Sequence, residues 1–202
     1  AQSHVGIARR LAQDAGARQR RDAIVRLPLS LRDVTAAVRA AGSLVELATA
    51  EANSSNDERD TAEKAALLHA LGAPESGTLP PSIRSQVRQL EEDQKRRSKR
   101  SITDTLDRAL TDLLSFYRDA LVLQLSGAGA GESGSPGSGD GGQAAAELVN
   151  AALRPELLAF AAASTPETTL IRMDAINSVR RRITTTNVAP LLAIEAMAVS
   201  LL

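Results

Sequence analysis

The stretch ITDTLDRALTDLLSFYRDAL, residues 102–121, determines the fold class of this 202-residue chain. Its apolar side chains recur at spacings of three and four residues, which places them on one side of an α-helix. A helix with such a stripe must lie against other helices and belong to a core. The positions that form the stripe are Ile102, Leu106, Leu110, Leu113, Tyr117, Ala120 and Leu121.

This helix is predicted to extend far beyond the quoted stretch. Residues 82–125 contain neither glycine nor proline and are expected to form one long helix. Its first half differs from its second, because residues 84–100 carry seven basic residues against three acidic ones and few apolar ones. We expect this half to be solvated.

Composition extends the helical prediction to the whole chain. Alanine and leucine supply 63 residues, whereas phenylalanine, tyrosine and tryptophan together supply three. Because strand-favouring side chains are scarce, we predict an all-α protein. The formal net charge is zero, so no whole-chain attraction to nucleic acid or to an anionic membrane is expected. Cysteine is absent, which excludes disulfides and cysteine metal ligands.

Apolar periodicity predicts three helices before the long one. The first covers residues 3–21, the second runs from Ser30 to the polar run at 53–56, and a short third covers 57–71. Glycine and proline residues at 72–81 form a linker.

The remainder of the chain opens with a segment predicted to be disordered. Residues 126–142 include eight glycines and no large apolar side chain. Residues 143–163 are expected to be helical. Thr165 followed by Pro166 is typical of a helix start, and that helix is expected to end near Asn187. Its predicted core face consists of Ile171, Ala175, Val179 and Ile183.

Pro190 opens a last helix that extends to Leu202 and is apolar on nearly all sides. Such a helix is expected to be buried between neighbouring helices or in an interface with another protein.

No pattern of catalytic or metal-binding residues stands out. The glycine-rich run lacks the preceding strand and the following Gly-Lys-Ser of a phosphate loop. His4 and His69 are not spaced as a pair of metal ligands, and no Ser-x-x-Lys occurs. We therefore expect no enzyme activity, no metal and no cofactor.

Three basic clusters occupy residues 18–21, 95–100 and 180–182. The interleaved aromatic residues that stack single-stranded bases are missing, so base readout is not expected. Solvated helix faces or contacts with acidic partners are the preferred interpretation. Two alternatives stay open. A DNA-binding helical module would place the three clusters on one face, and an enzyme would place a buried carboxylate or histidine in a cleft.

Segments at both ends of the chain carry a resemblance to a known family. Residues 3–12, SHVGIARRLA, resemble the last helix of an AAA+ lid, with Gly6 where active ATPase subunits carry a sensor arginine. Residues 180–182 together with 187–197, NVAPLLAIEAM, resemble the closing motif of clamp-loader collar domains. With residues 96–110, these segments are similar to the delta-prime subunit of bacterial DNA polymerase III, of actinobacterial type. This subunit is the non-motor member of the clamp loader.

The resemblance implies two parts and an assembly role. Residues 1–27 would be the last helix of the lid with a connector, and residues 28–202 would be the helical collar, or oligomerisation, domain. The chain begins with alanine, which indicates a piece of a longer protein. The implied protein is cytoplasmic and non-catalytic. It binds the ATPase (tau/gamma) and delta subunits through the collar, reaches DNA only indirectly, and has no membrane partner.

The residues expected at the partner interface come from the closing motif and the arginine helix before it. They are Arg180, Arg181, Asn187, Leu191, Leu192, Ile194, Glu195 and Met197.

Overall fold

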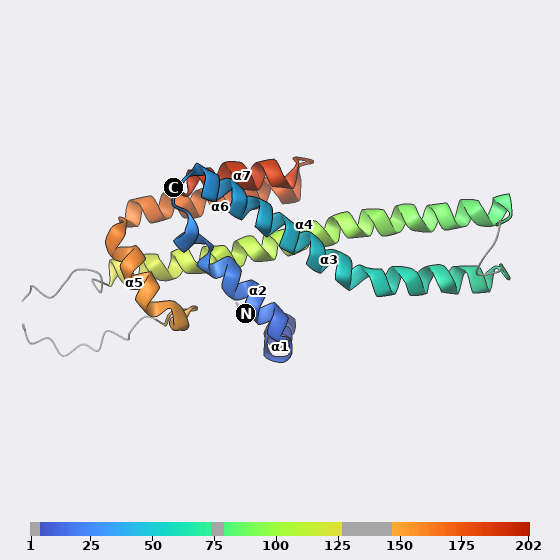
Figure 1. Cartoon of the computed structure of the whole chain (residues 1–202), viewed down its shortest axis with the longest axis horizontal. Coiled ribbons are helices and arrows are strands. Elements are labelled where there is room, and N and C mark those ends of the chain that lie inside the picture. Colours follow the sequence, from blue (N-terminus) through green and yellow to red (C-terminus); the bar gives the residue numbers. More distant parts are fainter. Residues whose placement is uncertain (1–4, 74–78, 127–146) are drawn as a thin grey trace, which may run out of the picture.

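The computed structural model describes residues 5–73, 79–126 and 147–202, and every regular element in these ranges is helical. The all-α prediction is therefore confirmed for the described residues (Figure 1). The α-helices are α1 (Val5–Gln13), α2 (Ala15–Arg26), α3 (Val34–Ala70), α4 (Pro81–Leu125), α5 (Arg154–Ala163), α6 (Pro166–Thr185) and α7 (Pro190–Ser200), with short 3₁₀ helices at Leu27–Ser30 and Ala151–Leu153.

The first predicted helix is two helices in the structure. The chain breaks at Asp14, whose backbone is extended and whose carboxylate accepts a hydrogen bond from the N–H of Ala17 at 3.0 Å. This side-chain acceptor replaces a bond that a continuous helix would make, so a new helix starts there. α2 then packs on α4 and buries Val25 in the same core as the rest of the chain.

The second and third predicted helices are one continuous helix, α3, so the expected break at 53–56 is wrong. These polar residues remain helical where α3 packs along α4, and the hydroxyl of Ser98 on α4 donates to Asn53 at 3.4 Å. α3 begins at the cap residue Asp33 and ends before Gly72, whose φ of 62° lies in the left-handed region that glycine tolerates.

The long helix predicted for residues 82–125 is confirmed as α4. Its first half and the second half of α3 run side by side away from the other helices, as Figure 1 shows. We call this pair, residues 53–70 and 81–98, the arm. The arm corrects the expectation that residues 84–100 are simply solvated, because Val87 is buried and Arg97 lies 2.6 Å from the Asp60 carboxylate of α3.

The second half of α4 occupies the centre of the core and contacts α2, α3, α5 and α6. Its stripe is buried as predicted, with Leu106, Leu110 and Leu113 at 0% exposure. Phe116 and Tyr117 complete the stripe and pack edge to face with Phe160 of α5, at ring-centroid distances of 5.1–5.7 Å. The chain's three aromatic residues therefore form one contact group.

In the C-terminal half of the chain, the predicted helix start at Thr165 is confirmed, because the Thr165 side chain caps α6. Its core face differs from the prediction, because Ile171 is 67% exposed. The buried positions of α6 are instead Thr169, Ile176, Val179 and Ile183. Of the helix predicted for 143–163, the regular α-helical part begins only at residue 154. The segment predicted to be disordered lies, apart from Ser126, outside the described residues.

Candidate functional site

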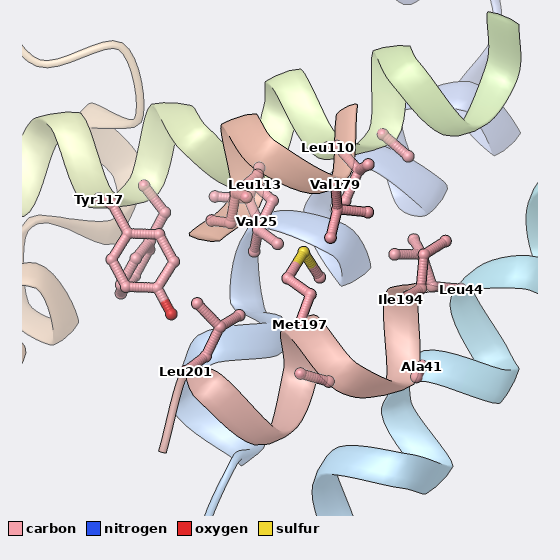
Figure 2. Packing of buried hydrophobic residues seen from close by; sticks show 14 of the residues in the cluster. Val25, Ala41, Leu44, Leu110, Leu113, Tyr117, Val179, Ile194, Met197 and Leu201 are labelled. Atoms are coloured by element: carbon pink, nitrogen blue, oxygen red, sulfur yellow. The ribbon is translucent and has the colours of Figure 1, made fainter. Parts of the chain in front are cut away.

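The last helix, α7, divides its side chains between the core and the surface. Ile194 and Met197 are 1% and 3% exposed, and Figure 2 shows both pointing from α7 into the hydrophobic cluster. The sequence interpretation placed both residues in a partner interface, whereas the structure places them in the chain's own core. They are buried because residues three apart on a helix share the face that packs on α3 and α6.

The opposite face of α7 is apolar and exposed. Leu192 is 64% exposed and Val199 is 38% exposed, and their spacing of seven positions brings both to the same side of the helix, two turns apart. Glu195 is half-buried and lies on the turn between them. Leu191 and the terminal Leu202 add two further exposed leucines at the two ends of the helix. We call these five residues the α7 outer face.

The arginines of α6 differ in their contacts: one is paired within the chain, and others are exposed to solvent. Arg180 makes a bidentate ion pair with Asp107 of α4, at 2.8 and 3.1 Å. Its guanidinium therefore joins α6 to α4 within the chain. Arg181 is exposed and donates to the Ser178 hydroxyl, and Asn187 is exposed in the turn before α7. Among the residues predicted for the interface, Arg181, Asn187, Leu191 and Leu192 are exposed and Glu195 is half-buried, so these five are accessible to a partner.

Two exposed apolar residues near this surface were missed by the sequence analysis. Leu170 and Ile171 are 52% and 67% exposed near the start of α6. The neighbouring Arg172 donates to the carbonyl of Leu202 at 2.9 Å, which joins the start of α6 to the end of α7. The available signal was the seven-residue spacing from Thr169 to Ile176, which identifies a core face that excludes Ile171.

A second feature is a cleft of about 960 Å³ between α2, α3 and α4, at the base of the arm. Seven arginines line it: Arg20, Arg21, Arg59, Arg97, Arg100, Arg108 and Arg180. Members of all three basic clusters therefore meet there, although they are far apart in the sequence. The DNA-binding alternative required the three clusters on one face, and the cleft brings together only part of them, since Arg18, Arg181 and Arg182 do not line it.

Four carboxylates also line this cleft: Glu51, Asp104, Asp107 and Asp112. The enzyme alternative required a buried carboxylate or histidine, whereas these four are half-buried or exposed. Burial raises the pKa of Asp112, and the nearby Arg21 opposes this shift. The two side chains form an ion pair at 3.0 Å, and Arg21 also donates to Asn150 at 2.9 Å. Asp112 is thus engaged by a structural partner. The described residues contain no group of three side chains able to hold a metal ion.

A buried polar network adjoins Arg21. Asp119 is 0% exposed and accepts hydrogen bonds from the N–H groups of Val149 and Asn150, at 3.1 and 2.7 Å. It also accepts from the Asn150 amide and the Arg118 guanidinium, at 3.0 and 2.9 Å. Since its oxygens are occupied by these donors, Asp119 anchors the chain before α5 rather than presenting a reactive carboxylate.

Across the described ranges, every helix is either too short or too polar to span a lipid bilayer. No protein-family model, curated protein or solved structure matches the chain.

Proposed function

We propose that the chain is an assembly domain, namely the collar of a non-motor clamp-loader subunit of the delta-prime family, acting in the bacterial cytoplasm. The observation that carries this proposal is the α7 outer face. The resemblance of residues 187–197 to the collar closing motif adds the identity of the partners, the ATPase and delta subunits.

The α7 outer face is unusual for an eleven-residue helix whose other side is already packed. A single exposed leucine is common on a protein surface and needs no explanation. Here Leu191, Leu192, Val199 and Leu202 are all at least 38% exposed on or directly after one helix. Each Å² of apolar surface that a partner covers contributes about 25 cal/mol, so this face favours association.

The surrounding charges fit a docking role. Arg181 is exposed beside the turn at Asn187, and Glu195 lies within the apolar face. Charged groups at the rim of an interface set its register and speed association more than they add affinity. A non-catalytic role agrees with most of the charged groups in the cleft being engaged in ion pairs, such as Arg180 with Asp107.

The test measures binding of the chain to the C-terminal domains of clamp-loader ATPase and delta subunits. Leu192→Asp should weaken binding by at least tenfold, because truncating or charging a central interface residue costs more than about 1.4 kcal/mol. Val34→Asp is the matched control, since Val34 is 56% exposed and also lies in the first turn of a helix. Arg181→Glu should weaken the same binding in a salt-dependent way.

Helix content and melting temperature of each variant are measured in parallel. Full binding by Leu192→Asp would remove the α7 outer face from the interface. Equal loss with Val34→Asp would show a non-specific effect of the added charge. Absence of binding by the unmodified chain to any of these domains would refute the collar assignment.

A further inference from the structure

The convergence of three separate basic clusters on one cleft is not explained by an assembly role. Arg20 and Arg21 come from α2, Arg97 and Arg100 from α4, and Arg180 from α6. The residues that line the cleft lie where the arm leaves the core. Gathering cations in one place costs repulsion energy unless carboxylates or a bound anion compensate it.

Carboxylates compensate most of these arginines. Arg21 pairs with Asp112 at 3.0 Å and Arg180 with Asp107 at 2.8 Å. Arg97 is held by Asp60 and Glu63, Arg59 also pairs with Glu63, and Arg20 lies 3.4 Å from Asp14 and from Glu51. These arginines are committed to the fold.

Two cleft arginines form no ion pair within 4 Å among the described residues, although Arg108 lies close enough to Asp112 to oppose the rise that burial causes in the pKa of that carboxyl. Arg100 is exposed and makes no hydrogen bond or ion pair there. Arg108 is exposed and donates to the carbonyl of Asp104 and to the hydroxyl of Thr105, which are both uncharged acceptors. These two guanidiniums carry the free positive charge of the cleft.

Positive charge continues along α4 beyond the cleft. Arg96, Arg100 and Arg108 occupy one row of the helix, at intervals of four and eight residues, and Asp104 fills the remaining turn. Arg96 is exposed and lies 3.5 Å from Asp93, so its charge is partly compensated. The row is about 18 Å long at 1.5 Å per residue. Lys95 and Lys99 are exposed beside it. A positive surface of this length exceeds what a single phosphate group or a nucleotide needs.

The geometry points to this row, with the mouth of the cleft, as a binding site for the phosphodiester backbone of a double-stranded nucleic acid. Duplex DNA carries about one phosphate charge per 1.7 Å of its axis, so a row about 18 Å long lies against more than one phosphate. No aromatic side chain lines the cleft, so the stacking contacts of a single-strand site are missing. Binding is therefore independent of base sequence and strongly dependent on salt. This inference is independent of the assembly role of α7.

The test is fluorescence anisotropy of the full chain with duplex DNA of mixed sequence over a series of salt concentrations. The double variant Arg100→Ala, Arg108→Ala should bind at least tenfold more weakly. The slope of log affinity against log salt should become less negative by about 2, since each lost phosphate contact contributes about 0.9. The matched control is Arg32→Ala, Arg154→Ala, which removes two exposed arginines that do not line the cleft.

A variant that increases the positive charge of the row distinguishes a phosphate-binding role from a purely structural one. Asp104 is exposed between Arg100 and Arg108, so Asp104→Asn removes the one carboxylate in the row. This variant should bind duplex DNA more tightly and with a steeper salt slope, an effect that damage to the fold would not produce.

Each alternative outcome overturns the inference in a defined way. Absence of salt-dependent binding, or equal losses in the cleft and control variants, would exclude the row as a phosphate site. Tighter binding to single-stranded than to duplex DNA would exclude a duplex ligand. Competition by polyglutamate at the same charge concentration as DNA would identify an acidic protein partner in its place.

Discussion

Replacing Asp119 tests the buried polar network most directly. Its carboxylate is 0% exposed and accepts from the N–H of Val149, the N–H and side-chain amide of Asn150, and Arg118. These bonds tie the chain before α5 to the last two turns of α4. Asp119→Ala removes the acceptor of three N–H donors, two on the buried Asn150 and one on Val149, which is 41% exposed. The exposed Arg118 can turn to solvent.

The expected cost follows from the donors left without an acceptor. A buried donor that loses its partner costs about 1–3 kcal/mol, and local rearrangement recovers part of that. For the three donors around residue 119 we predict a loss of about 3–5 kcal/mol in the free energy of unfolding, as for other buried charged groups that lose a partner. Asp119→Asn retains one acceptor oxygen and should cost about 1–3 kcal/mol.

The measurement is urea unfolding at equilibrium, followed by circular dichroism. Asp104→Ala serves as the control, because Asp104 is an exposed carboxylate of the same helix and its loss should stay within about 0.5 kcal/mol. A cost below about 1 kcal/mol for Asp119→Ala would refute the reasoning, since it would mean that water satisfies the donors around residue 119.

Two further predictions concern the core and the arm. Leu110→Ala should cost about 2–5 kcal/mol in urea unfolding because the side chain is fully buried, whereas Leu125→Ala, at 72% exposure, should stay within about 0.5 kcal/mol. Hydrogen bonds from Arg97 and then Arg59 lower the pKa of Glu63 from 4.5 to about 2. Its contribution to stability is therefore complete above pH 4.5 and is lost as the pH falls towards 2. Glu63→Gln should flatten the dependence of the unfolding free energy on pH in that window, and an unchanged slope would contradict this assignment.

Local signals in the sequence predicted the long helices well. The absence of glycine and proline over 82–125 was sufficient for α4, because nothing in that range opposes helical backbone angles. Thr165 followed by proline correctly marked the start of α6. The stripe that begins at Leu106 correctly identified the part of α4 at the centre of the core. These features depend on residues close together in the chain.

Features that depend on distant contacts were predicted poorly. The polar run at 53–56 looked like a helix end, yet α3 continues through it and packs along α4, where Ser98, 45 residues later, donates to Asn53. Asp14 was overlooked as a cap, although aspartate at a helix start is a recognisable signal. Ile171 was assigned to the core on spacing alone, and the register of α6 against α4 and α7 decides otherwise.

The arginine cleft could not have been predicted from any one segment. Arg20, Arg97 and Arg180 each belong to a short basic cluster, and such clusters are usually solvated. Their meeting depends on how α2 and α6 pack on either side of the same part of α4. The sequence interpretation nevertheless supplied the correct discriminating question, which was whether the three clusters share a face.

The ionic contacts inside the arm explain how the row on α4 keeps its position. Two helices packed only on each other bury little apolar surface, and Leu68 and Val87 are the large buried residues near the tip. Closer to the core, Arg97 bonds to both Asp60 and Glu63 across the two helices. Sliding α4 by one turn would separate these partly buried charges, which costs more than the pair contributes to stability. The contact therefore sets the register of the arm, and through it the distance of Arg100 from the α2 side of the cleft.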